Sequence, residues 1–253
     1  MFSAPIAWQT DVMSTIRGAR ERARAEVTAA IKDEARRQLA AEGAAKLSLR
    51  AVARELGMVS SALYRYFPSR DDLLTALIVD AYDAVGEAAE AARGKAGEPA
   101  VPHPARWLAV ACAVRDWALA HPHEYALIYG SPVPGYTAPQ DTVGPASRVG
   151  QVLIGLVRDA YLADGLAVPR QDAGLRTEGA RMAADLAEDL PPAVVVALVA
   201  AWAQLFGLIS FELFGQFNRV VEAREQFFRH AVHELGRSVG LLDGRSAGAG
   251  GTG

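Results

Sequence analysis

The chain has 253 residues, of which 51% are hydrophobic and 22% charged, a composition typical of a soluble globular protein with one large or two small domains. Its one cysteine, Cys112, excludes an intrachain disulfide and a cysteine-rich metal site, and is most simply a core residue of a protein in the reducing cytoplasm. The net charge of −3 is uneven, because residues 1–72 hold 12 Lys and Arg against 9 Asp and Glu, whereas the remainder holds 14 against 20. This polarity favours a basic nucleic-acid-binding part, although enzymes with two parts can show the same difference.

The first 22 residues are predicted to form a flexible basic extension. Residues 1–15 have no helical periodicity, and they lack the basic-then-apolar order of a secretory signal, which favours a cytoplasmic protein. Four arginines crowd around the boundary between this segment and the first predicted helix: Arg17, Arg20, Arg22 and Arg24. Such an arm can reach phosphates or a minor groove, whereas the interleaved Glu21 and Glu26 are typical of a solvated helix face. We expect non-specific attraction to DNA rather than base reading.

Three helices are predicted between residues 23 and 68. The first covers residues 23–42 and ends at Gly43, with apolar residues at i+4 spacing: Val27, Ile31, Ala35 and Leu39. The second starts after Ser48 as N-cap and ends at Gly57, with one apolar face: Leu49, Val52, Ala53 and Leu56. The third is capped by Ser60 or Ser61 and ends at Pro68, so it has about two turns.

The third helix has one apolar side and one narrow polar side. Leu63 and Phe67 share the apolar side, while Ser61 and Arg65 lie nearly opposite. A helix of this kind fits a major groove about 12 Å wide. An ordinary helical hairpin with a solvated outer face has the same pattern, so the helices alone leave both possibilities open.

The order of the residues resembles the amino-terminal DNA-binding domain of the TetR family of bacterial transcriptional regulators. The resemblance covers about residues 24–75, and its most specific part is the run LGMVSSALYRYFPSRDDLL. The chain departs from the family pattern at Tyr66, which is usually His, and at Arg70, which is usually Lys. Both side chains can still donate a hydrogen bond to a phosphate.

The resemblance implies a DNA-binding surface on the second and third helices. Arg50 would reach a base, Arg65 and the small residues before it would line the recognition surface, and Tyr64, Tyr66 and Arg70 would contact phosphates. The expected DNA-binding residues are Ser48, Arg50, Ser60, Ser61, Ala62, Tyr64, Arg65, Tyr66 and Arg70. The alternatives are that Arg50 only complements the surface charge and that Tyr66 belongs partly to the core.

The rest of the chain is predicted to be helical. Ser69 caps a helix that reaches about residue 92, with Asp71 and Asp72 in its first turn, and we expect this helix to be the only continuous connection between the two parts. Residues 93–105 and 131–145 are loops, and the second either borders a binding site or is a simple linker. Further helices are expected over residues 106–121, 123–130, 146–163, 175–190, 193–211 and 218–242.

An aromatic segment follows the first of these loops and weakly resembles the effector-binding domain of one branch of TetR-like regulators. Aromatic walls with a few polar groups suit a small organic ligand, whereas each residue alone is more typical of a core or a helix cap. The expected effector-binding residues are Trp107, Trp117, His121, Tyr125 and Tyr129. His121 and His123 have no further ligand at metal-binding spacing, so neither zinc nor another cofactor is expected.

Residues 193–211 contain no charge. Their length would permit a membrane span, but no Lys and Arg cluster flanks them, which favours a helix buried between its own core and a partner. Together with residues 218–242 they look like half of a four-helix dimer bundle. The resemblance implies the same interface, so we expect a homodimer without membrane contact, with Leu205 and Phe228 as candidate interface positions.

These patterns predict an all-α fold in four parts. They are a flexible extension (1–22), a helix-turn-helix domain (23–75), an effector-binding and dimerisation domain (76–242) and a disordered tail (243–253). The predicted function is a repressor, released from palindromic operator DNA by a small hydrophobic effector. The alternatives are an activator, a small all-helical enzyme, or a protein-interaction module; the chain has no phosphate-binding glycine loop, nucleophile elbow or HExxH pattern.

Overall fold

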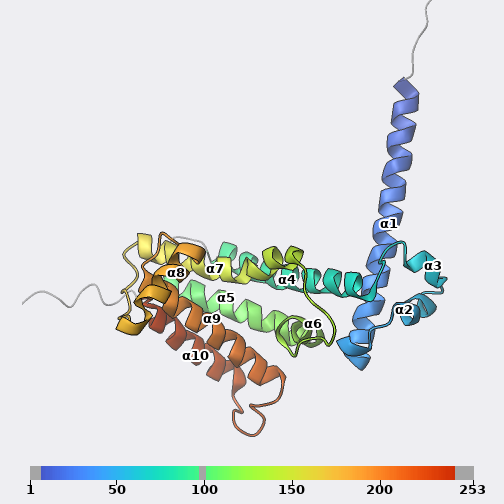
Figure 1. The fold of residues 1–253 in the computed structure, drawn as a ribbon. Coiled ribbons are helices and arrows are strands. Elements are labelled where there is room, and N and C mark those ends of the chain that lie inside the picture. The colour runs from blue at the N-terminus through green and yellow to red at the C-terminus, as the bar shows by residue number, and fades with distance from the viewer. Residues whose placement is uncertain (1–6, 97–100, 243–253) are drawn as a thin grey trace, which may run out of the picture. The chain divides into compact units, whose positions relative to one another are not determined.

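The structure, a computed structural model, describes residues 7–96 and 101–242, with side chains from Gly18 onward. The described part contains helices and turns, with no strand beyond an isolated bridge between Leu166 and Leu241, so the fold is all-α as predicted (Figure 1). The chain divides into two compact units. The first, the head, comprises Met1–Leu77 and Pro132–Thr137; the second, the body, comprises Ile78–Ser131 and Ala138–Gly253. The tail predicted to be disordered lies outside the described residues.

The head is a small helical core. It contains α1 (Ala7–Glu42), the short 3-10 helix η1 (Ala44–Lys46), α2 (Leu49–Glu55), α3 (Ser60–Leu63) and the first turns of α4 (Arg70–Lys95). The predicted three-helix core is confirmed, because most of its members are buried: Ile31, Ala35, Leu39, Leu49, Val52, Leu63 and Phe67. Val27 and Leu56, which were also expected in it, are half-buried.

Helix α1 begins at Ala7, not at Ala23 as predicted. The prediction of a flexible extension over residues 1–22 is therefore wrong from Ala7 onward, and residues 1–6 lie outside the described part. No proline interrupts the chain between Ala7 and Glu42, and Gly18 costs only about 1 kcal/mol relative to alanine in a helix. Residues 19–26 of this helix are all exposed, so no apolar periodicity is expected in that part of the sequence although it is helical.

A loop from the middle of the sequence also belongs to the head. Pro134 and Gly135, with φ of +77° at the glycine, occupy the central positions of a turn closed by Tyr136 N–H donating to Val133 O at 3.1 Å. This is the arrangement of a type II turn, in which proline fixes the first position and glycine permits the second. The turn places the Tyr136 hydroxyl 2.9 Å from the Thr75 hydroxyl on α4. The chain thus passes between head and body three times, and the prediction that α4 is the only connection is wrong.

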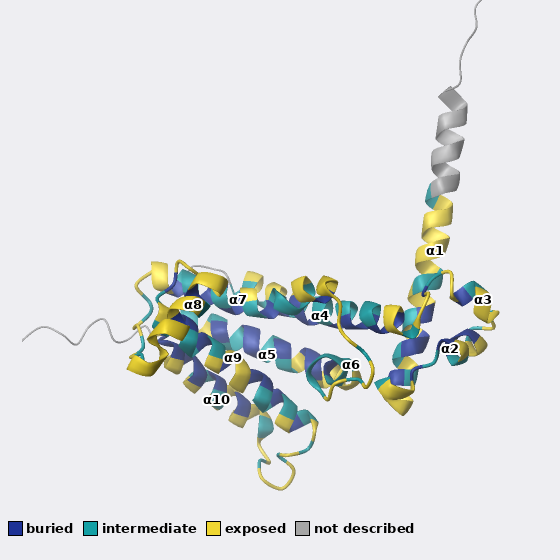
Figure 2. Ribbon diagram, viewed as in Figure 1, coloured by how far each residue is buried: buried dark blue, intermediate teal, exposed yellow. Residues whose placement is uncertain are grey.

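The body is a helical bundle around one core. It contains the rest of α4, α5 (His103–Ala120), α6 (Pro122–Tyr129), α7 (Val143–Leu162), α8 (Arg176–Leu186), α9 (Pro192–Leu213) and α10 (Arg224–Val239), with short 3-10 helices at Gln140–Thr142 and Ala173–Leu175. Figure 2 shows the buried residues on the inner faces of these helices. Helix α10 begins six positions later than predicted, because Gly215 and Arg219 adopt positive φ of +85° and +62° and break the helical path.

Helix α9 is apolar on all sides but only partly buried. Among the described residues it is the one helix whose length and composition would allow it to cross a membrane. Its most apolar 18-residue window has a mean hydropathy of 2.2, and 39% of that window is buried inside the protein. Core helices of soluble proteins meet the same criterion. Leu205 and Phe228 are 1% and 2% exposed within the protomer. Their assignment as partner-facing positions is therefore wrong, since both are already enclosed by the body's own core.

Candidate functional site

Local interactions set the geometry of the α2–α3 segment. The Ser48 side chain accepts a hydrogen bond from Ala51 N–H at 3.4 Å and caps α2, as predicted. Gly57, with φ of +64°, ends α2, and Met58 N–H donates to Ala53 O at 2.8 Å. Helix α3 has Val59 as its N-cap rather than Ser60 or Ser61, and neither serine caps it by a side chain. Its helical turns continue beyond Leu63, because Phe67 N–H donates to Leu63 O at 3.1 Å.

The predicted DNA-binding residues form the outer surface of this segment. Leu63 and Phe67 are buried beneath α3. The residues exposed on the outside are Arg50, Ser60, Ser61, Tyr64 and Arg65, and those half-buried are Ser48, Ala62, Tyr66 and Arg70. The surface offers guanidinium and hydroxyl donors next to a small methyl group, which are groups that can read base edges in a major groove.

A shallow hollow lies beside this surface. Its volume is about 350 Å³, and it is lined by Leu47, Ser48, Leu49, Arg50, Tyr64, Ser69 and Arg70. Four of the predicted DNA-binding residues therefore meet around one depression. A concave site with hydroxyl and guanidinium groups on its rim is chemically suited to a phosphate.

Arg70 is bound mainly to the protein's own backbone. Its Nε donates to Leu47 O at 3.2 Å and its Nη2 donates to Ala44 O at 2.8 Å. The guanidinium thus ties the start of α4 to the η1 segment before α2. Arg70 holds the walls of the hollow together, a role that the resemblance did not imply.

Arg24 contacts the edge of the predicted DNA-binding surface. Its guanidinium carbon lies 5.3 Å from the centre of the Tyr66 ring, and its Nη2 donates to Arg65 O at 3.5 Å. The cluster of arginines in the sequence pointed to this region, but spacing alone could not show that Arg24 contacts the end of the recognition segment.

In the body, the predicted effector residues fall into three places. Trp107 is 1% exposed and donates from Nε1 to Val232 O at 3.0 Å, so it belongs to the core between α5 and α10. Trp117 and His121 form a stacked pair with ring centres 5.3 Å apart. Tyr125 and Tyr129 lie on α6, with ring centres 5.1 Å apart. The five residues therefore do not form one site.

Tyr125 and Tyr129 instead meet aromatic residues of α9. The Tyr129 ring centre is 4.1 Å from that of Phe206, and the Tyr125 hydroxyl donates to Phe206 O at 3.0 Å. Burial raises the pKa of Tyr125 to about 12 and raises the pKa of Tyr129 as well, so both phenols are neutral donors at pH 7. Neutral phenols on an aromatic wall suit an uncharged or weakly polar organic molecule.

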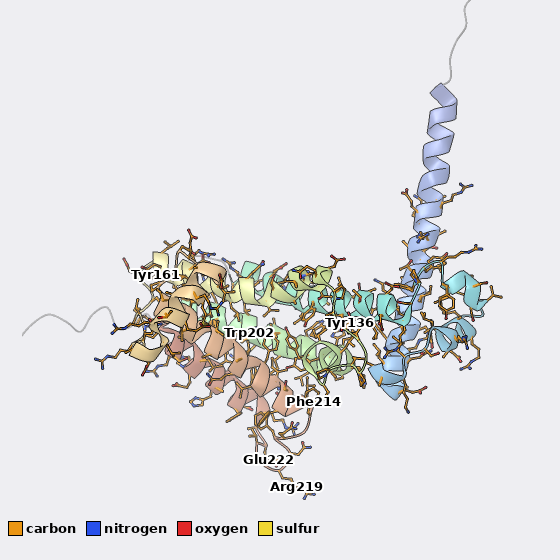
Figure 3. The ribbon with its side chains drawn as sticks, in the orientation of Figure 1. Tyr136, Tyr161, Trp202, Phe214, Arg219 and Glu222 are labelled. Atoms are coloured by element: carbon orange, nitrogen blue, oxygen red, sulfur yellow. The ribbon has the colours of Figure 1, made fainter. Side chains whose placement is uncertain are left out.

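The residues of α9 that contact Tyr125 and Tyr129 were not predicted from the sequence. Trp202, Phe206, Ser210 and Phe214 follow each other at i+4 spacing, and Figure 3 labels Trp202 and Phe214 on or just after α9. The Phe214 ring centre is 6.2 Å from that of Tyr125, and the Ser210 hydroxyl is 2.9 Å from the Tyr125 hydroxyl. The i+4 row was the available signal, but it was hidden in a segment that is apolar on every side.

Within the residues that the structure describes, no group of three or more His, Cys, Asp or Glu side chains could hold a metal ion. His121 donates from Nδ1 to Trp117 O, 2.9 Å away, and His123 is exposed at the start of α6.

Comparisons with known proteins agree with this geometry. Residues 31–77 match the family model described as bacterial regulatory proteins of the tetR family, and residues 107–235 match the tetracyclin repressor-like C-terminal domain. The HTH-type transcriptional regulators Mb1846 of Mycobacterium bovis and Rv1816 of Mycobacterium tuberculosis are each 43% identical to the chain, over 79% of its length and 86% of theirs.

Solved structures give the same result. The regulatory protein SCO4313 is 34% identical, with a TM-score of 0.69 over 85% of this chain and 97% of its own. A TetR-family regulator from Rhodococcus RHA1 shares the fold at 16% identity, with a TM-score of 0.59 over 85% of this chain and 98% of its own. The relatives are regulators rather than enzymes, and the match extends over both head and body. The chain therefore belongs to the TetR family of bacterial transcriptional regulators.

Proposed function

We propose that this protein is a ligand-responsive repressor that binds a palindromic operator as a dimer and is released by a small hydrophobic effector. One observation carries the DNA-binding part: α3 is anchored by buried Leu63 and Phe67, while Arg50, Ser61 and Arg65 are exposed on the outer side of the same helix pair. Binding to chromosomal DNA would place its action in the cytoplasm.

The exposed groups divide by chemistry into base-reading and phosphate-binding residues. Arg50 and Arg65 can each form a bidentate contact with guanine, and the Ala62 methyl can contact a thymine methyl. Tyr64, on the rim of the hollow, can donate to a phosphate without reading sequence. Arg70 is not a free phosphate donor, because its Nε and Nη2 groups donate to backbone carbonyls.

Arginine substitutions test the groove assignment. DNA fragments retained by the purified protein would first be sequenced, and we expect a partial palindrome with half-sites about one helical turn apart or a multiple of it. Arg50→Ala and Arg65→Ala should each weaken operator binding by about 1–3 kcal/mol and relax base preference, whereas Tyr64→Phe should weaken all duplexes alike. The measurement is a titration of the operator and single-base variants.

Arg170→Ala is the matched control, because Arg170 is an exposed arginine of the body and its removal changes the net charge equally. If both head variants keep the parent's affinity and base preference, the groove assignment is wrong.

The dimer proposal rests on an exposed stripe of α9. Ala200, Ala203 and Phe211 are exposed and Gly207 is half-buried, at spacings of three and four residues. A Cβ atom at Gly207 would meet no atom of the protomer within 4 Å, and no positive φ requires glycine there. A glycine that its own protomer does not explain favours close approach of another helix, as in the α9–α10 interface that the family implies.

The effector proposal places a small organic molecule against Tyr125, Tyr129 and the aromatic side of α9. Its effect on DNA must be reciprocal, so the operator should weaken effector binding by the factor by which the effector weakens operator binding. Typical couplings are about 1–3 kcal/mol. An effector that instead tightens the complex would make this protein a corepressor-dependent regulator.

The loop after α6 offers a direct route from that site to the head. Helix α6 ends at Tyr129, and the chain enters the head at Pro132 and reaches Tyr136 within seven residues. Pro132, Pro134 and the type II turn limit the conformations of this loop. A shift of α6 can therefore reach α4 through the Tyr136–Thr75 hydrogen bond as well as along α4 itself.

Tyr136→Phe tests this route, since it removes one hydroxyl and keeps the ring. We expect the coupling between effector and operator to fall by about 1 kcal/mol, or about fivefold, which is the usual net value of one such hydrogen bond. Effectors would be found by quenching of tryptophan fluorescence and titrated against the protein–operator complex. Tyr161→Phe, at an exposed position of α7, is the control (Figure 3). An unchanged coupling in Tyr136→Phe would mean that α4 alone carries the signal.

A further inference from the structure

We propose that the amino-terminal half of α1 is a second DNA-binding surface, which contacts phosphates beside the half-site through the helix face that carries Arg20 and Arg24. This inference rests on the proposed DNA binding of the head and adds a sequence-independent contact to it. It concerns only the head unit, to which all of α1 belongs.

The first observation is that α1 is far longer than the head core requires. It has 36 residues, yet among those from Gly18 onward, where side chains are described, the buried residues begin at Ile31 and end at Leu39. Every residue from 19 to 26 is exposed (Figure 2). An isolated helical segment gains little stability in water, because most helical stability in proteins comes from packing. The exposed stretch at residues 19–26 of this core helix is therefore expected to have an external partner.

The second observation is the charge of this extension. Residues 17–24 contain four arginines and one glutamate, a local excess of positive charge in a chain whose net charge is −3. Such a run near a DNA-reading surface favours a polyanionic partner.

The third observation is where the extension is attached. Arg24 contacts the Tyr66 ring and the Arg65 carbonyl, near the end of the segment formed by α3 and the turn that continues it to Phe67. Arg20 precedes Arg24 by four residues, so it lies on the same face of α1, about 6 Å farther along the axis. The arginine face of α1 thus starts at the edge of the predicted DNA-binding surface of α2 and α3 and leads away from it. The phosphate backbone of the DNA that flanks a half-site would run along this direction.

The helical geometry also selects the type of contact. A helix with side chains is about 10–12 Å across, whereas the minor groove of B-DNA is about 6 Å wide. A helical extension cannot enter that groove as a flexible arm can. Contact with phosphates, without base reading, is therefore the mode that fits.

The test compares two arginines of the same extension. Arg20 and Arg22 are both exposed, and they point to nearly opposite sides of α1 because they are two residues apart. Arg20→Ala and Arg22→Ala remove the same charge and add the same helix-favouring residue. Operator affinity would be measured against salt concentration for the parent and both variants, on a long duplex and on one trimmed to the two half-sites.

On the long duplex, we expect Arg20→Ala to lower the slope of log affinity against log salt by about 1, the value for one lost phosphate contact, and to leave base preference unchanged. Arg22→Ala should keep the parent's slope. On the trimmed duplex, all three proteins should bind alike.

Equal slopes for the parent and Arg20→Ala on the long duplex would overturn the inference. An equal decrease of the slope of log affinity against log salt in Arg20→Ala and Arg22→Ala would also overturn it, because it would indicate a general charge effect. If the parent protein itself shows no preference for any duplex, the proposed function is wrong instead. The experiment therefore distinguishes failure of the α1 contact from failure of specific DNA binding.

Discussion

Gly207→Arg is expected to convert the dimer into a monomer and to weaken operator binding by about 10²–10⁴-fold, the usual gain from two linked binding events. The variant should fold, because the protomer leaves open space around a Cβ at Gly207 and arginine favours a helix more than glycine does. In a dimer through α9, however, the new charge would be buried without a partner. Light scattering measures the mass, and titration of the operator measures the affinity.

Gly150→Arg is the matched control. Gly150 lies within α7, and a Cβ there also meets no atom within 4 Å. The two variants share the same gain in charge and helix propensity. A Gly207→Arg protein that stays dimeric would exclude α9 as the interface. A Gly150→Arg protein that becomes monomeric would move the interface to α7.

Glu212→Ala is expected to lower the free energy of unfolding by about 3–5 kcal/mol, because it removes the nearest counterion of a buried arginine and leaves Arg115 only a longer ion pair, 3.8 Å, with exposed Asp116. The Glu212 carboxylate accepts two hydrogen bonds from Arg115, at 2.8 Å and 2.6 Å, and the two side chains are 7% and 11% exposed. The Arg115 guanidinium also lies 5.2 Å from the centre of the Phe228 ring, so it cannot easily reach water. Denaturant unfolding at one fixed protein concentration measures the loss.

Two comparisons isolate the buried charge as the cause. Replacing both partners, as Arg115→Met with Glu212→Leu, should recover most of the loss, because no unpaired charge remains. Glu178→Ala removes the exposed Glu178–Arg181 pair and should leave the unfolding midpoint near that of the parent. A Glu212→Ala protein as stable as the parent would show that solvent or another group compensates Arg115.

The helix-turn-helix could be predicted from the sequence because its signals are local. Ser48 caps α2, Gly57 takes the positive φ that ends it, and Ser69 begins α4 by accepting from Asp72 N–H at 3.1 Å. Each of these depends on a residue's own conformational preferences and on neighbours within four positions. The side of α3 that faces outward follows from helical period in the same way, so the exposed positions of Ser61 and Arg65 agree with the pattern.

The start of α1 and the start of α10 could not be predicted with the same accuracy. Residues 19–26 of α1 are all exposed, so apolar periodicity, which reports burial, gives no signal there. Before α10, the backbone turns at Arg219 with φ of +62°, a conformation that arginine rarely adopts by itself. Only the surrounding structure can stabilise it.

The candidate sites also combine features that local sequence determines with features that only tertiary packing determines. Sequence by itself determined which residues are exposed at the predicted DNA-binding surface, since exposure there follows from the helical period of α2 and α3. Tertiary structure decided that Arg70 is bound to backbone carbonyls, that Trp107 lies in the core, and that Phe206 and Ser210 join Tyr125. It also decided which side of α9 is buried, because a helix that is apolar all round has no periodicity that selects a face. Only packing against the neighbouring helices leaves Phe211 exposed and Gly207 half-buried.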